Sequence, residues 1–133
     1  MNYFSRLITI LSFFRLILKE LSNYSILSED SQLAILHVVG GLDDDITQKA
    51  SEASKKGQTI EFAKMKFKSY IKSLRRRNIH NNMDILCAIS NTLDRIAHSK
   101  YLCKQRKLDL YDAQQSVYDD ICNYSETIPS TQE

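Results

Sequence analysis

Glycine and proline are scarce in this sequence, which has three glycines and one proline in 133 residues. Turn-rich β-sandwiches and barrels need such residues to reverse the chain. Their scarcity therefore argues against an all-β fold and favours long helices. The length suits one ordinary domain, and the hydrophobic content of 43% is enough for a compact core.

Closely spaced cysteine pairs are also lacking. Cys87, Cys103 and Cys122 form an odd set, whereas a secreted disulfide framework has an even number of cysteines, usually at tight spacing. We therefore expect free thiols in a reducing compartment and a cytoplasmic protein. The cysteines and histidines do not show the spacing of a tetrahedral zinc site, so we expect no metal and no cofactor.

The segment 3–21 is the most hydrophobic part of the chain, because twelve of its nineteen residues are large and apolar. A helix with so much apolar surface must be covered on most of its circumference. We predict that it is the central helix of a bundle, with a homodimer through this helix as an alternative. The polar residues in and around it recur at steps of three or four and form one narrow stripe: Asn2, Ser5, Thr9, Ser12, Arg15, Lys19 and Ser22.

A membrane role for this segment is disfavoured. Arg15 and Lys19 would each cost about 2.5–3.5 kcal/mol near the centre of a bilayer. A signal peptide would need a longer uncharged run followed by a small-residue cleavage site, and neither is present. We therefore expect no membrane partner.

The middle of the chain shows helix start and stop signals. Ser28, followed by two acids, predicts the N-cap of a second helix, and we expect this helix to stop at Gly40-Gly41. Asp43–Asp45 would then open a third, weaker helix over residues 43–57. Thr59 would cap a fourth helix with a clear apolar stripe.

Residues 83–124 contain no glycine or proline. The apolar series fades near residue 98, and we place a break at residues 104–108, with one bent helix as the alternative. The sequence thus predicts an all-α, single-domain bundle of about five or six helices around the hydrophobic N-terminal helix. The bundle would span residues 1–125, and residues 126–133 would be a flexible C-terminal tail.

Charge is segregated along the chain, although the net charge is only +2. Residues 59–83 carry a net charge of +6, whereas residues 20–54 and 108–133 each carry −6. Such blocks can neutralise one another across a folded surface, or they can attract partners of opposite charge.

No combination of residues typical of a catalytic site is visible, so we predict that the protein is not an enzyme. His37 lies between two apolar residues, and we expect a half-buried imidazole there rather than a ligand. A rigid helical body with single-sign patches is typical of a protein that occupies a partner's surface. The most concrete form would be an immunity- or antitoxin-type inhibitor of a toxin with a basic, nuclease-like surface. The predicted contact residues are Asp43, Asp44, Asp45, Asp119 and Asp120.

The alternative function is nucleic-acid binding. Basic residues recur at steps of three or four on the predicted fourth helix, opposite its apolar stripe, and such a ridge can neutralise phosphates. Stronger support for RNA or DNA binding would be aromatic residues between the basic ones, or a recognisable binding module. Phe67 and Tyr70 alternate with the lysines but lie on the apolar face. The residues of this alternative site are Lys64, Lys68, Lys72, Arg75, Arg76 and Arg77.

Overall fold

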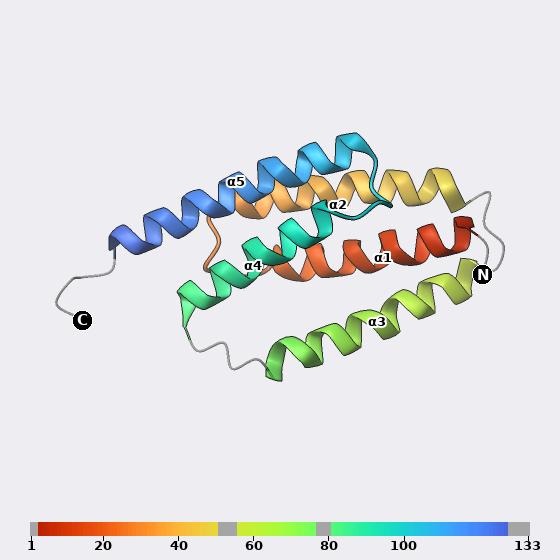
Figure 1. Cartoon of the computed structure of the whole chain (residues 1–133), viewed down its shortest axis with the longest axis horizontal. Coiled ribbons are helices and arrows are strands. Elements are labelled where there is room, and N and C mark those ends of the chain that lie inside the picture. Colours follow the sequence, from red (N-terminus) through yellow and green to blue (C-terminus); the bar gives the residue numbers. More distant parts are fainter. Residues whose placement is uncertain (1–2, 51–55, 77–80, 128–133) are drawn as a thin grey trace.

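The computed structural model describes residues 3–50, 56–76 and 81–127, with side chains at all of these except 56–60, 74–76 and 126–127. This part of the chain contains no strand and five helices: α1 (Tyr3–Leu21), α2 (Glu29–Ala50), α3 (Lys56–Arg76), α4 (Asn82–Ala97) and α5 (Lys104–Thr127). Successive helices run in opposite directions, so α1, α3 and α5 are parallel to one another and antiparallel to α2 and α4 (Figure 1). The predicted all-α bundle is confirmed.

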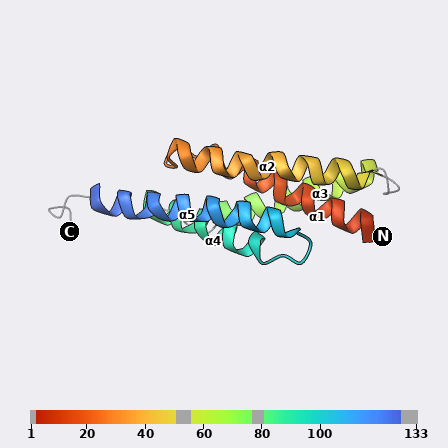
Figure 2. The same ribbon diagram turned by 90° about the horizontal axis from the view of Figure 1, so that it is seen from above.

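The helices pack in a spatial order that differs from their order in the chain. α1 lies between α2 and α3, α2 also packs against α5, and α5 packs against α4. Seen from above, α2 lies on one side of α1, whereas α4 and α5 lie on the other side (Figure 2). None of the helices in the described ranges combines the length and the hydropathy needed to cross a lipid bilayer.

α1 is the central helix, as the sequence predicted. Its large side chains are buried on several sides: Leu7, Ile8, Leu11, Ile17, Leu18 and Leu21. Even part of the polar stripe is buried, because its hydroxyls find partners within the helix. Thr9 Oγ1 donates to the Ser5 carbonyl at 2.8 Å, and Ser22 Oγ donates to the Lys19 carbonyl at 2.7 Å. Among the described residues of α1, Tyr3 is the one large hydrophobic side chain that is well exposed, which leaves little apolar surface for a homodimer.

α2 corrects the prediction of a stop at Gly40-Gly41. The helix runs through both glycines to Ala50, and residues 43–50 belong to it rather than to a separate third helix. A glycine in a helix interior costs about 1 kcal/mol relative to alanine. Burial of one large apolar side chain contributes roughly 1.5–3 kcal/mol, and the buried series on α2 continues across the glycines: Ile35, Val38, Val39 and Leu42.

The other boundaries lie close to the predicted ones. Ser28 is the N-cap of α2, because its hydroxyl accepts the Ser31 N–H at 3.2 Å. α3 begins at Lys56, three residues before Thr59. The chain between α4 and α5 turns at residues 98–103, slightly before the predicted break, so residues 84–124 form two helices rather than one bent helix. α5 reaches Thr127, and the remainder of the predicted tail, 128–133, lies outside the described residues.

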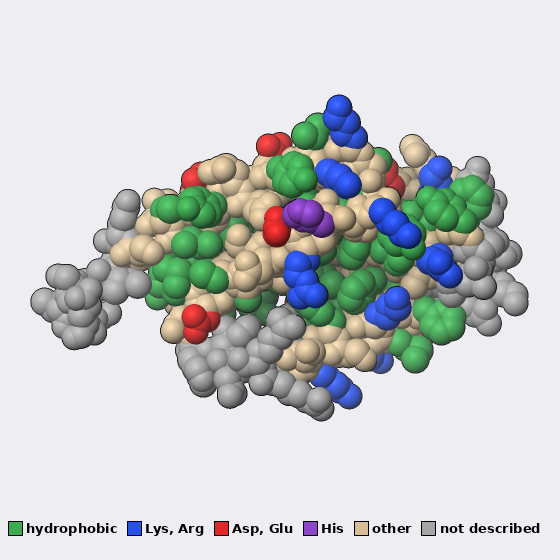
Figure 3. All heavy atoms as spheres, in the orientation of Figure 1, with side chains coloured by type: hydrophobic (Ala, Val, Ile, Leu, Met, Phe, Trp, Pro, Cys, Tyr) green, Lys and Arg blue, Asp and Glu red, His purple; other side chains and the backbone are tan. Residues whose placement is uncertain are grey.

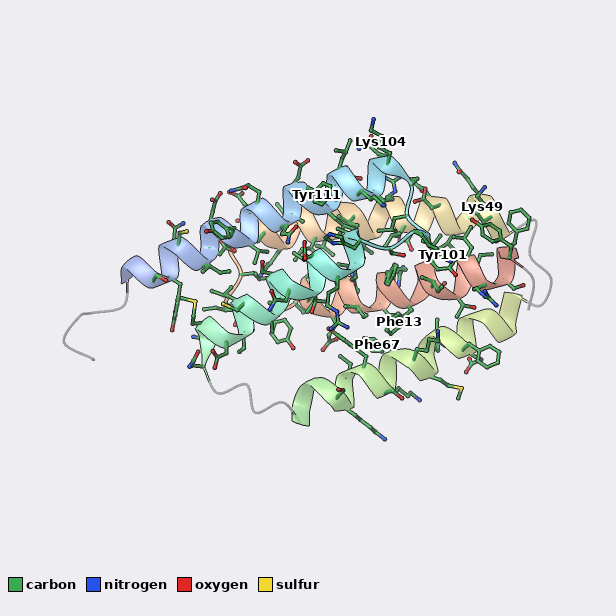
Figure 4. All side chains as sticks on the ribbon, in the orientation of Figure 1. Phe13, Lys49, Phe67, Tyr101, Lys104 and Tyr111 are labelled. Atoms are coloured by element: carbon green, nitrogen blue, oxygen red, sulfur yellow. The ribbon has the colours of Figure 1, made fainter. Side chains whose placement is uncertain are left out.

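α3 packs along α1, and aromatic side chains contribute to this contact. Phe67 and Tyr70 pack against the core from one side of the helix. The Tyr70 ring meets the Phe13 ring edge-on, with centroids 6.1 Å apart, and the Tyr70 hydroxyl lies 3.0 Å from Thr92 Oγ1 on α4. The labelled Phe13 and Phe67 in Figure 4 lie where α1 faces α3.

The central position of α1 predicts a large difference between two leucine truncations. Leu18 is 0% exposed, whereas Leu33 on α2 is 56% exposed. Leu18→Ala should lower the free energy of unfolding by about 2–5 kcal/mol, and Leu33→Ala by no more than about 0.5 kcal/mol. Urea unfolding followed by circular dichroism measures both. Equal losses in the two variants would contradict the central placement of α1.

Candidate partner-binding site

Four polar contacts join α2 to α5 along their length. Near the start of α2, the Ser28 N–H donates to Asp120 Oδ2 at 3.1 Å, and Ser31 Oγ lies 2.7 Å from Ser116 Oγ. Further along, His37 Nε2 lies 3.7 Å from Asp109 Oδ1, and Asp45 accepts from Arg106 at 2.8 Å. We call this line of contact, with the solvent-facing residues beside it, the α2–α5 seam. From Ser28 to Asp45 it extends about 25 Å, at 1.5 Å of helix rise per residue.

Arg106 is the electrostatic centre of the seam. Its side chain is only 16% exposed and joins two carboxylates, Asp45 at 2.8 Å and Asp109 at 2.9 Å. Gln105 Nε2 also donates to Asp109 at 2.9 Å, so the 6% exposed carboxylate of Asp109 is well satisfied. The hydrogen bond to Asp45 raises the pKa of the Arg106 guanidinium above its ordinary value, although burial alone would lower it. Arg106 is therefore a fixed cation that neutralises only part of the surrounding negative charge.

Gly41 makes room for this arrangement. A Cβ at Gly41 would lie 2.4 Å from the Arg106 Cζ and 2.6 Å from its Nη1. A Cβ at Gly40, one residue earlier, would meet no atom within 4 Å. Gly41 is thus required for the close approach of the guanidinium to α2, whereas Gly40 borders open space.

That open space is a pocket of about 660 Å³ at the seam. Because both glycines lack side chains, the backbone of α2 forms one wall, and α5 forms the other with Gln105, Arg106 and Asp109. His37 and Asp44 complete the lining, and both are exposed. The sequence predicted a half-buried His37, which is wrong: its side chain is 73% exposed and lies beside Asp109. The neighbouring Leu36 is also exposed, and the core is formed by Ile35, Val38 and Val39.

Acidic side chains line the solvent side of the seam at multiples of seven residues along each helix. Seven residues are nearly two turns of an α-helix, so positions seven apart share a face. Asp30 and Asp44 flank His37 at this spacing on α2, and Asp112 and Asp119 follow Gln105 on α5. All four aspartates are exposed, and within the described residues none of them forms an ion pair. The seam therefore presents four carboxylates that no cation of this part of the chain neutralises.

The five acids predicted as partner contacts all lie on α2 and α5, but in two groups at opposite ends of the seam. Three of them already form hydrogen bonds or ion pairs with other residues of the protein. Asp43 accepts from Arg15 on α1, Asp45 from Arg106, and Asp120 from the Ser28 N–H. The other two are exposed: Asp44 borders the pocket, and Asp119 accepts a hydrogen bond from Gln115 at 3.3 Å.

The alternative basic ridge is described only in part. Lys64, Lys68 and Lys72 are exposed on α3, and Lys64 lies 3.7 Å from Glu61. The side chains of Arg75, Arg76 and Arg77 lie outside the described residues. Among the residues that are described, no three His, Cys, Asp or Glu side chains come together as a metal site. The three cysteines are free and exposed.

Sequence reasoning missed Arg106, Asp109, Asp30 and Asp112. The pairing of Arg106 and Asp109 with α2 depends on contacts between distant segments, which no local pattern reveals. The positions of Asp30 and Asp44, each seven residues from His37, are by contrast visible in the sequence once α2 is taken as one continuous helix.

Comparisons with protein-family models, with curated proteins and with solved structures gave no match to this chain.

The two adjacent glycines predict opposite effects of the same substitution. Gly40→Ala should raise the free energy of unfolding by about 0.5–1 kcal/mol, because alanine favours the helix and the site has room. Gly41→Ala should lower it by about 1 kcal/mol. The displaced Arg106 would lose hydrogen bonds to charged groups worth about 1.5–3 kcal/mol, which outweighs the gain in helix propensity.

Chemical denaturation of both variants tests this difference. Stabilisation by Gly41→Ala equal to that by Gly40→Ala would show that Arg106 is not held against α2.

Proposed function

We propose that this protein acts by binding a basic surface of another protein through the α2–α5 seam. The observation that carries the proposal is the set of four exposed aspartates without a cationic partner in the described chain. Folded proteins tend to intersperse charges of both signs on their surface. A row of exposed carboxylates about 21 Å long costs self-repulsion and accelerates association with a partner of opposite charge.

The rigidity of the seam supports this function. Each acidic stripe lies on a helix of more than twenty residues, and the two helices are joined by the Arg106 ion pairs and by the Ser31–Ser116 contact. Carboxylates on a fixed scaffold lose little conformational freedom when a partner binds, which favours affinity.

The pocket suggests how a partner could be anchored. Asp44 and Asp109 lie in its lining with one fixed cation, Arg106, so the pocket carries an excess of negative charge. A lysine or arginine side chain of the partner, entering beside Gly40, would meet Asp44 at the surface. Arginine residues are frequent anchors of protein interfaces because they combine planar hydrogen bonding with apolar contact.

The most specific form of this proposal is an immunity- or antitoxin-type inhibitor. A nuclease toxin needs a basic surface to accept phosphates, and an acidic seam would cover such a surface by charge complementarity. The exposed free thiols are compatible with a reducing compartment such as the cytoplasm.

A charge-reversal pair tests the proposal. Asp44→Lys/Asp112→Lys should weaken binding to the partner at least about 100-fold, since close interfacial charge pairs couple by roughly 1.5–7 kcal/mol. The matched control, Glu20→Lys/Glu61→Lys, makes the same change in net charge on α1 and α3, where both glutamates are exposed, and should change affinity less than about threefold. The partner is first identified by proximity labelling in the source cell, and affinities are then measured with purified proteins by calorimetry.

Equal weakening by the two pairs would show that only net charge matters, and unchanged binding by the seam variant would exclude the seam as the contact surface. A second pair of variants addresses the pocket: Gly40→Leu should block binding, whereas Gly40→Ala should not.

A further inference from the structure

A second pocket lies where α1 packs against α3, and its chemistry differs from that of the seam. It has a volume of about 220 Å³ and is lined by Arg6, Thr9 and Ile10 of α1 and by Phe62 and Lys66 of α3. Two cations from different helices thus border one hollow that also contains an aromatic ring. The seam does not contribute to this pocket, so an inference from it is independent of the proposed function.

The cations at this pocket lack acidic partners. Arg6 and Lys66 are both exposed, and within the described ranges neither forms an ion pair. The neighbouring Lys68 and Lys72 of α3 are exposed and have no ion pair there either. Lys and Arg side chains gather on the half of the surface in Figure 3 where α1, α3 and α5 begin. This region therefore attracts anions.

Phe62 supplies an exposed aromatic ring close to basic residues. Nucleic-acid binding favours aromatic rings among the basic residues, and Phe67 and Tyr70 are partly buried against the core. Phe62 is instead 44% exposed and borders the same hollow as Lys66, one helical turn away. A base has a flat apolar face that can cover such a ring, and its phosphate can be neutralised by cations on either side.

We propose that the α1–α3 pocket binds single-stranded nucleic acid, with a phosphate between Arg6 and Lys66 and a base stacked on Phe62. A hollow of this size between two parallel helices suits an extended strand, because a duplex presents its bases inside the stack rather than as free faces. A membrane surface shares the preference for cations and apolar groups. A flat membrane surface would contact side chains that protrude from the protein, however, whereas Phe62 borders a hollow.

The probe is a fluorescein-labelled oligouridylate of about 12 nucleotides, with binding followed by fluorescence anisotropy at several salt concentrations. Arg6→Glu/Lys66→Glu should weaken binding at least tenfold and reduce the slope of log K against log salt by about 0.7, because one phosphate contact with a single strand is lost. Phe62→Ala and Phe62→Leu should each weaken it about 5- to 100-fold, whereas Phe62→Tyr should retain it, because the ring rather than apolar bulk provides stacking. Lys104→Gln and Lys66→Gln form a matched pair, and only the second should weaken binding.

The variants are expected to fold, since Arg6, Phe62 and Lys66 are all exposed and an acid in the first turn of α1 is favourable to the helix dipole. Circular dichroism checks this. Three results would overturn the proposal: no binding of the oligonucleotide at low salt; binding indifferent to Phe62, Arg6 and Lys66 but lost on reversal of Lys64, Lys68 and Lys72; or sedimentation with phosphatidylserine vesicles in place of oligonucleotide binding.

Discussion

The need to bury α1 determines how the other helices are arranged. Its large apolar side chains point in many directions, so no single neighbour can cover them. α2 and α3 flank α1, α5 packs on α2, and α4 packs on α5. Nearly all the charged residues of the described chain lie at the surface of this bundle. Their positions on the helices therefore determine the charge of each face.

The α2–α5 seam and the α1–α3 pocket carry charge of opposite sign, and their charged side chains differ in burial and pairing. Exposed aspartates line the α2–α5 seam around the half-buried Arg106. Exposed lysines lie on α3, where Lys66 borders the α1–α3 pocket together with Arg6. In the seam, Arg106 pairs with the half-buried Asp45 and the buried Asp109, whereas the exposed aspartates form no ion pair within the described residues. At the α1–α3 pocket, the cations are exposed and the aromatic ring beside them is left out of the core. Two partners of opposite charge could therefore be accommodated without competing for the same surface.

The sequence predicted those features that depend on residues close together along the chain. The apolar content of residues 3–21 identified the central helix, and Ser28 with its two following acids identified a helix start. The prediction of a stop at Gly40-Gly41 was wrong, because a glycine pair ends a helix only where tertiary contacts do not continue it, and here buried residues follow on the same face. Arg106 and Asp109 were missed for a related reason: their role arises from the pairing of α2 with α5. Asp44 and Asp119 were proposed as partner contacts from charge alone, and both are exposed on the seam.

Paramagnetic relaxation measured with charged nitroxide probes would test the separation of these faces most directly. Amide signals of the isotopically labelled protein are recorded with a cationic nitroxide and then with an anionic one. The cationic probe should broaden the amides around Asp44 and Asp112 most strongly, whereas the anionic probe should broaden those around Arg6 and Lys66. The same broadening pattern from both probes, or the reverse assignment, would contradict a molecule with two oppositely charged faces built around α1.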